Sequence, residues 1–278
     1  MRHALWIPLL CLVGCGDESE PETTGSFAFV DVTEEWGLDF THDAGLTPEK
    51  HLPETMGAGC ALADFDSDGD LDLYLIQGGE LPVPGVADDG NMNRLYRNQG
   101  GGELVDATHG AGAAAHTGYG MGVAVGDCDG NGHLDMYLSC LGEDALLFGN
   151  GTAWFRDGTA ASGVRDERWT AGCVFFDADS DGDLDLYVTA YLDVDLETPT
   201  WCGDRREGWR SYCHPDHYDG LPDRFWRNEG DGTFVDATGA AGFSDSRGKG
   251  LGAIPADLDS DGDLDLYVAN DSTENRLW

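Results

Sequence analysis

The sequence predicts an all-β protein, a β-propeller of four-stranded blades, from features that repeat along its 278 residues. An aspartate-rich segment of nine residues occurs four times, and short apolar segments with strand periodicity flank each copy. Two further motifs recur between the copies in a fixed order. Four-stranded units that repeat every 50 to 80 residues are typical of propeller blades. The alternative, a linear β-solenoid, usually has much shorter repeats.

The four aspartate-rich segments share one arrangement of oxygen-bearing side chains. We call them loop 1 (residues 64–72), loop 2 (127–135), loop 3 (177–185) and loop 4 (257–265). Positions 1, 3, 5 and 9 carry Asp or Asn, position 6 is Gly and position 8 is Leu. A tight loop with this spacing points alternate side chains at one centre, and converging oxygen ligands suit Ca²⁺. The sequence therefore predicts about four Ca²⁺ ions, one in each loop.

The predicted ligands are the side chains at positions 1, 3, 5 and 9, together with position 7, where only the backbone carbonyl is expected to bind. They are Asp64, Asp66, Asp68, Asp70, Asp72, Asp127, Asp129, Asn131, His133, Asp135, Asp177, Asp179, Asp181, Asp183, Asp185, Asp257, Asp259, Asp261, Asp263 and Asp265. Loop 2 carries the least charge and is expected to bind most weakly. The alternative is that these segments are ordinary solvated turns.

The residues around the loops indicate strands instead of the helices that flank an EF-hand. An EF-hand also needs a bidentate glutamate at position 12, where this chain has Leu75, Leu138, Val188 and Val268. Apolar residues alternate with Asp or Tyr after the loops, as in residues 71–75, and short apolar segments precede them, as in residues 122–125. Each loop therefore joins the first and second strands of a unit.

Two further motifs predict the third and fourth strands of each unit. The third-strand motif places Leu or Phe beside an aromatic residue, and the fourth-strand motif reads Phe-x-Asp-x-Thr or a close variant. The third-strand segments are residues 93–98, 146–150, 223–228 and 275–278, and the fourth-strand segments are residues 29–33, 104–108, 155–159 and 234–238. Glycine-containing turns between them indicate hairpins. The chain thus encodes about four units, which form either a closed four-blade ring or part of a larger ring.

The first 15 residues have the pattern of a lipoprotein-type signal peptide. Arg2 and His3 precede an apolar run that is too short to span a bilayer, and residues 12–15 resemble a bacterial lipobox. This resemblance implies an exported bacterial protein, lipidated at Cys15 and anchored to the membrane. The alternative is an ordinary signal peptide and an extracellular or periplasmic protein. Residues 16–26 are acidic and polar, which predicts a flexible tether, and residues 27–278 hold the repeats.

The charge and the cysteine content restrict the classes of binding partner and the cellular compartment that we expect. The formal net charge is −38, which argues against nucleic acid or an anionic membrane surface as a partner. Membrane contact is expected only through the lipid anchor. Cys202 and Cys213 lie in one inserted segment, residues 193–218, and are predicted to form a disulfide. The pairing of Cys60, Cys128, Cys140 and Cys173 stays open.

The ordered set of motifs resembles FG-GAP/VCBS repeats, the repeats of integrin-α-like propellers. It is most similar to the cartilage acidic protein family, including bacterial exported members with an ASPIC/UnbV domain. The resemblance rests on the four loops and on residues 93–98, 212–215, 230–234 and 268–271, and it covers roughly residues 27–278. It implies a seven-bladed propeller with Ca²⁺ in the blade loops. This chain has about four units and no recognisable ASPIC/UnbV segment, so ring size is not fixed.

These features favour an exported, calcium-binding and non-enzymatic module for adhesion to protein or carbohydrate ligands at a cell surface. The inserted segment carries Trp201, Trp209 and Tyr212 beside several arginines. Aromatic and arginine side chains on a pinned loop suit such an interface. The alternative is that these aromatic residues pack the segment onto its own blade.

Two other functions stay open. An extracellular enzyme, such as a carbohydrate-active hydrolase, could use paired carboxylates. However, nearly all obvious pairs lie in the loops, the sequence shows no nucleophile-elbow, zinc-protease or phosphate-loop motif, and no catalytic residue is assigned. An assembly scaffold is the other alternative, because an open ring would expose strand edges that favour oligomerisation.

Overall fold

The computed structural model describes residues 28–81, 92–114, 118–206, 208–243 and 247–278. The chain divides into two compact units, Met1–Val32 and Thr33–Trp278. The predicted signal peptide, Cys15 and the tether lie outside the described residues. The prediction of a strand at residues 29–33 is wrong, because no strand forms there and Phe29 is exposed. A strand needs a paired neighbour, and no sheet of the described chain includes this segment.

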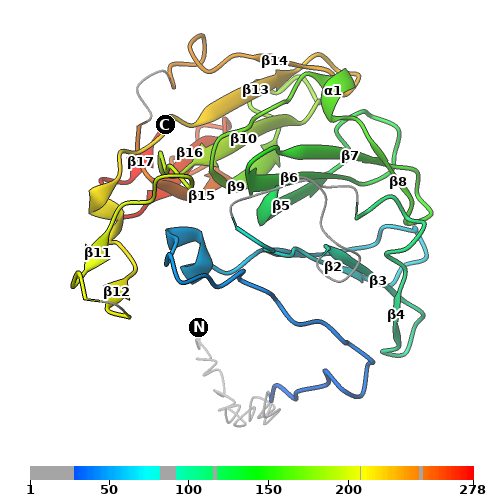
Figure 1. Cartoon of the computed structure of the whole chain (residues 1–278). Coiled ribbons are helices and arrows are strands. Elements are labelled where there is room, and N and C mark those ends of the chain that lie inside the picture. Colours follow the sequence, from blue (N-terminus) through cyan, green and yellow to red (C-terminus); the bar gives the residue numbers. More distant parts are fainter. Residues whose placement is uncertain (1–27, 82–91, 115–117, 207, 244–246) are drawn as a thin grey trace, which may run out of the picture. The chain divides into compact units, whose positions relative to one another are not determined.

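The unit Thr33–Trp278 is all-β, with five antiparallel sheets among its described residues (Figure 1). Sheet 1 contains β1 (Cys60–Ala63), β2 (Asp72–Leu75), β3 (Arg94–Asn98) and β4 (Leu104–Asp106). Sheet 2 contains β5 (Tyr119–Gly126), β6 (Asp135–Leu141), β7 (Ala145–Gly149) and β8 (Phe155–Asp157). Sheet 3 contains β9 (Thr170–Phe176), β10 (Asp185–Ala190), β13 (Arg224–Asn228) and β14 (Phe234–Asp236). Sheet 4 contains β15 (Gly250–Ala256), β16 (Asp265–Asn270) and β17 (Arg276–Leu277).

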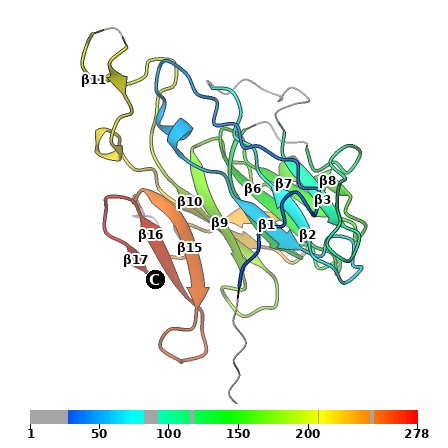
Figure 2. The same ribbon diagram turned by 90° about the horizontal axis from the view of Figure 1, so that it is seen from below.

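The remaining elements are short. The strands β11 (Cys202–Gly203) and β12 (Arg210–Ser211) pair within the inserted segment, between β10 and β13. Figures 1 and 2 both show this hairpin away from the four main sheets. The helical elements are η1 (Leu52–Thr55), α1 (Thr159–Ser162) and η2 (Pro215–His217). Among the described residues no helix is long and apolar enough to span a membrane.

The strand order confirms the predicted unit. In sheets 1 to 3 each loop joins the first two strands, and the last two strands form the hairpin predicted from the third and fourth motifs. The register is the same throughout, because the residue before each loop pairs with the Asp at loop position 9, as in Ala63↔Asp72 and Phe176↔Asp185. Sheet 4 has the first three strands only within the described residues.

Neighbouring sheets bury apolar side chains between them. Tyr74 and Leu95 of sheet 1 pack with Met136 and Phe155 of sheet 2 in one cluster. A second cluster joins sheets 2 and 3, and a third joins sheets 3 and 4. Side chains of a strand alternate between its two faces, so each sheet contributes one set of side chains to the preceding interface and another to the following one.

The first strands of consecutive sheets approach so closely that glycine is required where they meet. A Cβ on Gly59 would lie 3.2 Å from the Cα of Gly122, and one on Gly122 would lie 2.8 Å from the backbone oxygen of Ala171. A Cβ on Gly172 would lie 3.0 Å from the Cα of Gly252. These four glycines each precede a loop by five residues, and β1, β5, β9 and β15 therefore pack in series.

Candidate metal sites and the inserted hairpin

Backbone hydrogen bonds to the position-1 carboxylate fold each loop. In loop 1 Asp64 accepts hydrogen bonds from the N–H groups of Asp68 (3.1 Å) and Gly69 (3.0 Å). Asp127 and Asp177 accept the equivalent pairs, and Asp257 accepts from Gly262 at 3.2 Å. The glycine at position 6 has a φ between +85° and +101° in all four loops. This left-handed conformation explains why glycine occupies that position.

The Asp at position 9 joins loops 1 to 3 to the third strands of their sheets. Asp72 accepts from the N–H of Phe65 within loop 1 and from the N–H of Asn98 on β3. Asp135 and Asp185 make the same two contacts with loops 2 and 3 and the third strands of their sheets. Burial raises the pKa of all three carboxyls, although these hydrogen bonds lower it in part. A cation beside them would favour the ionised form.

The loops bring carboxylate oxygens together at four equivalent places. In each group the ligand atoms lie within 4.8 Å of one another. The groups are Asp64, Asp66 and Asp72; Asp127, Asp129 and Asp135; Asp177, Asp179 and Asp181; and Asp257, Asp259 and Asp265. The donor set is all oxygen and carries three negative charges per group, which fits Ca²⁺ and not a soft metal.

Some predicted ligands lie outside these groups. The carboxylates of Asp68 and Asp261 and the amide of Asn131, at position 5, accept a hydrogen bond from the N–H at position 7. Asp185, at position 9 of loop 3, also lies outside its group. The side chains at position 7 are Asp70, His133, Asp183 and Asp263, and the first three approach Gly100, Gly151 and Gly230 in the turns between the third and fourth strands. These side chains lie beside the turns, and the binding of the position-7 backbone carbonyl stays a prediction.

Loop 1 has one feature that the other loops lack. The guanidinium of Arg97, on β3, donates to Asp66 Oδ2. The second oxygen, Asp66 Oδ1, is buried and has no hydrogen-bond partner. A buried carboxylate oxygen without a partner is costly, and a cation held with Asp64 and Asp72 would satisfy it.

Comparison with known proteins agrees with this repeated geometry. A family model described as an FG-GAP-like repeat matches residues 83–138 and 216–268. The chain contains FG-GAP-like repeats. It is also 26% identical over 252 residues to human and to mouse cartilage acidic protein 1, an alignment that covers 85% of this chain. The chain spans about a third of the length of these curated relatives, because the alignment covers 34% of each. The FG-GAP-like resemblance predicted from the sequence is therefore confirmed.

The β11–β12 hairpin of the inserted segment lies between the two ranges that the family model matches. The structure joins Cys202 to Cys213, with their Cα atoms 5.3 Å apart. Trp201 lies under the guanidinium groups of Arg210, at 4.9 Å, and Arg205, at 5.8 Å. Trp209 stacks with Arg206 at 4.1 Å and is among the more exposed aromatic residues of the described chain. The two tryptophans thus present flat, cation-backed surfaces to solvent.

Tyr212 has a different environment from the two tryptophans. Its hydroxyl donates to Glu54 Oε2 at 2.8 Å, and the ammonium of Lys50 lies 5.1 Å from its ring centre. Glu54 is buried and also accepts from Thr47 Oγ1 and the N–H of His51. Burial raises the pKa of Glu54, but these hydrogen bonds outweigh it and hold the pKa below its ordinary value. Tyr212 therefore anchors the inserted segment to η1. For this residue the alternative applies, in which the aromatic side chains of the segment pack it onto the rest of the chain.

Three features of the structure were not predicted from the sequence. One is a buried Asn or Asp at the start of the third strand, such as Asp144 and Asp223, whose carboxylate accepts from the Tyr of the second strand. The available signal was Asn or Asp directly before Arg in three of the four third-strand segments; Asp144, which precedes Ala145, does not follow it. A second feature is the Tyr212–Glu54 contact, which links residues 158 positions apart and leaves no sequence pattern.

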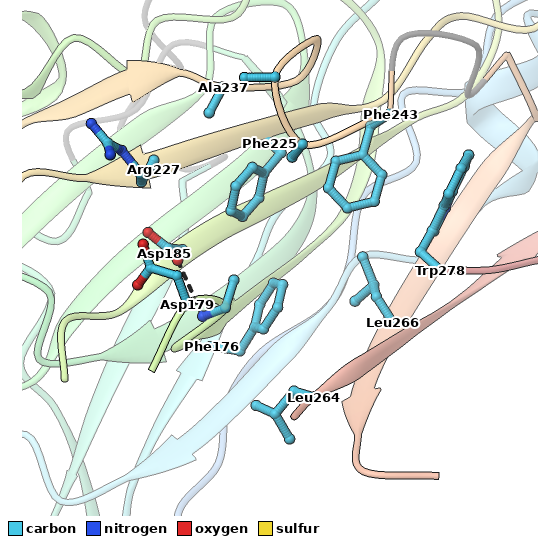
Figure 3. Close-up of a pocket in the computed structure, with 13 residues that line it drawn as sticks. Phe176, Asp179, Asp185, Phe225, Arg227, Ala237, Phe243, Leu264, Leu266 and Trp278 are labelled. Atoms are coloured by element: carbon cyan, nitrogen blue, oxygen red, sulfur yellow. Dashed lines mark hydrogen bonds between the residues drawn. The ribbon is translucent and has the colours of Figure 1, made fainter. Parts of the chain in front are cut away.

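The third feature is a pocket of about 390 Å³ between sheets 3 and 4 (Figure 3). Phe176, Phe225, Phe243 and Trp278 surround it, with Asp179, Asp185 and Arg227 at one end. At the interface of sheets 1 and 2 the equivalent residues enclose Phe155, the first residue of the fourth strand of sheet 2. The pocket therefore lies where a fourth-strand aromatic residue of sheet 4 would pack.

Proposed function

We propose that this chain is an exported, calcium-stabilised β-propeller that acts as a non-enzymatic binding module for protein or glycan ligands. The observation that supports the calcium role is the recurrence of a group of three carboxylates in all four loops, two of which lie in the ranges matched by the FG-GAP-like repeat model. Each Ca²⁺ would link the loop between the first two strands to the sheet. Binding energy would then contribute directly to folding.

The clustered charge gives the metal a further role in stability. The loops hold 18 of the 53 acidic residues, and the formal net charge is −38. Without a bound cation, these carboxylates repel one another and destabilise the compact state. Four Ca²⁺ ions would reduce the net charge to about −30 and remove the closest repulsions.

A thermal melt with Ca²⁺ and with EDTA tests the structural metal. A site that is saturated at 100 times its dissociation constant adds about 2.7 kcal/mol to the free energy of unfolding. We expect the melting temperature to rise with Ca²⁺, and to rise much less with Mg²⁺, which requires a tighter octahedral site. Equal melting temperatures in Ca²⁺ and EDTA would show that the loops are ordinary turns.

The β11–β12 hairpin is the ligand-binding surface that we propose. Trp201 and Trp209 are partly exposed, are held by a disulfide-linked hairpin and are stacked against arginines. Stacking on sugar rings or on protein side chains uses such surfaces. Tyr212 holds the inserted segment to Glu54 through a hydrogen bond, so it is not assigned to the ligand-binding surface.

Binding to a glycan array and to cell surfaces tests this assignment, with Trp209→Ala against the parent chain. The exposure of Trp209 means that the substitution should leave the melting temperature nearly unchanged. We expect it to weaken ligand binding at least about tenfold, which is typical of an interface hot spot. Unchanged binding by a folded Trp209→Ala variant would remove the hairpin from the proposal.

Export and the lipid anchor complete the proposal. They rest on the pattern of residues 1–15 and on Cys15, which lie outside the described residues. Mass spectrometry of the mature protein from a bacterial host tests them. An N-terminal diacylglyceryl-cysteine at position 15 would support a membrane-anchored lipoprotein, and an unmodified N-terminus downstream of it would support a periplasmic or extracellular protein.

A further inference from the structure

One turn of sheet 3 contacts two of the candidate metal loops. This turn, residues 228–233, joins β13 to β14. At Gly230 it approaches loop 3, where a Cβ on the glycine would lie 2.7 Å from Asp183 Oδ2. At Gly232 it approaches loop 2, where a Cβ would lie 2.8 Å from the Cβ of Asp129. The turn therefore lies between loops 2 and 3, and it touches a member of the loop 2 carboxylate group.

Asn228, the first residue of this turn, is buried and makes hydrogen bonds to both loops. Its side-chain amide donates to the backbone oxygen of Cys128 in loop 2 at 2.7 Å and to that of Leu184 in loop 3 at 2.9 Å. Its backbone N–H donates to Asp185 of loop 3, and its Oδ1 accepts from the N–H of Gly230 at 3.0 Å. An amide group has two N–H donors, so each of them is used in a different loop.

The contact with loop 2 falls between two of its proposed metal ligands. Cys128 is position 2 of the loop, so its carbonyl belongs to the peptide bond that leads to Asp129. The N–H of Cys128 donates to Asp135, at position 9 of the same loop. One hydrogen bond thus ties Cys128 to its own loop and the other ties it to sheet 3. Together they hold the backbone between Asp127 and Asp129, whose carboxylates would bind the same ion.

The equivalent link between loops 1 and 2 does not use a side chain. Gly149 occupies in sheet 2 the place that Asn228 occupies in sheet 3, and it has no amide group to donate. Instead, the N–H of Ala153 donates to the backbone oxygen of Phe65, at position 2 of loop 1, at 2.9 Å. A position-2 carbonyl accepts from the following sheet in both cases. Substitution of Asn228 can therefore weaken the link between loops 2 and 3 and leave the other link in place.

We propose that Ca²⁺ binding in loop 3 strengthens Ca²⁺ binding in loop 2, and conversely, through Asn228 and the 228–233 turn. This inference rests on the calcium role proposed above. Without a cation the five carboxylates of loop 3 repel one another, which loosens the loop and the turn that is bonded to it. A cation in loop 3 orders the turn, so a smaller loss of conformational entropy accompanies cation binding in loop 2. Thermodynamic linkage requires the same factor in both directions.

The sign of the effect distinguishes this coupling from direct electrostatics. Five carboxylates with one Ca²⁺ leave a charge of −3 on loop 3, whereas an empty loop 3 in Asp179→Ala carries −4. Electrostatics alone would therefore strengthen Ca²⁺ binding in loop 2 of that variant, and salt would screen the effect. The hydrogen-bonded link predicts weaker binding, at high and low ionic strength alike. Loop 2 has only three carboxylates, so we expect loop 3 to fill first.

The test is a Ca²⁺ titration of the full chain, followed by NMR at the glycine amides of loop position 6. The N–H groups of Gly132 and Gly182 each donate to the position-1 carboxylate of their own loop, so each reports its own site. Asp179→Ala removes a proposed ligand from loop 3, and Asp129→Ala removes one from loop 2 but keeps the Cβ beside the turn. We expect Asp179→Ala to raise the dissociation constant of loop 2 about fivefold or more, and Asp129→Ala to raise that of loop 3 by the same factor.

Asn228→Ala tests the link itself. When this substitution is present, Asp179→Ala should change the dissociation constant of loop 2 by less than about twofold. Asn98→Ala is the matched control, because Asn98 has the equivalent place in sheet 1 and donates to the backbone oxygen of Leu71 in loop 1. It should leave the coupling of loops 2 and 3 at its value in the parent chain. Melts without metal show whether Asn228→Ala folds, and the two ligand variants alone decide the coupling if it does not.

Three outcomes would overturn the proposal, and they differ in what they leave standing. No Ca²⁺-dependent change at Gly132 or Gly182 would remove the calcium role and the coupling together. Ca²⁺ binding in both loops, with loop 2 unaffected or strengthened by Asp179→Ala, would remove the coupling and leave the calcium role in place. Coupling that persists in Asn228→Ala would show that another contact carries it.

Discussion

The Asp185 carboxylate accepts a hydrogen bond from the N–H of Asn228 at 2.8 Å and so fastens loop 3 to the third strand of its sheet. Its other oxygen accepts from Ala178 at 3.1 Å. Asp179 lies in the carboxylate group of the same loop but accepts none of the hydrogen bonds described for that loop. In loop 3, Asp185 therefore holds the fold through hydrogen bonds, whereas Asp179 has only the proposed role of metal ligand.

The pair Asp179→Ala and Asp185→Ala should respond differently to Ca²⁺. Asp179→Ala should lower the melting temperature in Ca²⁺ and leave it unchanged or slightly raised in EDTA, because it removes only a ligand and a charge. Asp185→Ala should destabilise the chain under both conditions by about 2 to 4 kcal/mol, since it leaves two N–H groups without a partner. Denaturant titrations with and without EDTA measure both effects. A loss in EDTA for Asp179→Ala would contradict its assignment as a ligand.

Gly172→Ala and Gly252→Ala form a second matched pair. Both glycines stand five residues before a loop, but only Gly172 faces a neighbouring first strand, where a Cβ would lie 2.7 Å from the backbone oxygen of Leu251. We expect Gly172→Ala to cost about 2 kcal/mol or more through separation of β9 and β15. Gly252→Ala should be neutral within about 0.5 kcal/mol, because a Cβ there meets nothing within 4 Å. Similar melting temperatures for both variants would show that the close approach of these strands is not required.

Asp223 should make the stability of the chain depend on pH. Burial raises its pKa to about 6, although hydrogen bonds from Ala190 and Tyr187 lower it in part. The folded chain therefore holds this proton more tightly than the unfolded chain. The resulting stabilisation is complete below about pH 4 and is lost as the pH rises through about 6. The ionised carboxyl then costs up to about 3 kcal/mol at pH 7.

Asp223→Asn tests this cost and has a precedent within the chain. Asn275 holds the equivalent position in sheet 4, where it donates to the hydroxyl of Tyr267 and accepts from the N–H of Asn270. We expect the variant to keep both contacts, to be as stable as the parent chain near pH 4, and to be more stable at pH 7. Urea midpoints measured across this range in saturating Ca²⁺ give the comparison. If the stability of the variant and of the parent chain changed with pH in the same way, Asp223 would not be the source of the pH dependence.

Tyr212→Phe should loosen the insertion while leaving its fold intact. The substitution removes the hydrogen bond to Glu54 and should lower the free energy of unfolding by about 1 to 2 kcal/mol. Trp209→Ala, in the same segment, should change it by less than about 0.5 kcal/mol because Trp209 is largely exposed. Chemical denaturation of both variants gives the comparison. An equal loss in the two would mean that the hairpin does not depend on Tyr212.

Most of what could be predicted about the sheets came from the spacing of residues close together in the sequence. The phase of Asp and Gly in loop 1 specifies hydrogen bonds within nine residues, so it survives in any context that allows the turn. The alternation after each loop likewise predicts a strand without knowledge of its neighbours. The Phe29 segment shows the limit of this reasoning, because its sequence fits a strand but its formation depends on a paired neighbour.

Packing between sheets was harder to predict, although one signal was present. Gly172 and its equivalents recur at one distance from the loops, yet a glycine in a strand is explained only when the opposing backbone is known. The raised pKa of Asp223 depends on residues from several strands, and the Tyr212–Glu54 contact depends on how the insertion folds back. No periodicity in the sequence encodes these long-range relationships.

Within residues 33–278, the exposed side chains of sheet 4 predict where the sheets first open to solvent. A sheet that packs on one neighbour holds its strands less firmly than a sheet enclosed on both sides, so local opening begins there. Amide protons of β16 and β17 should exchange with solvent first, followed by those of β15, while those of β6 and β10 persist longest. Opening of residues 33–278 would thus begin at the outer sheets and reach sheets 2 and 3 last, one unit at a time, as in linear arrays of repeats.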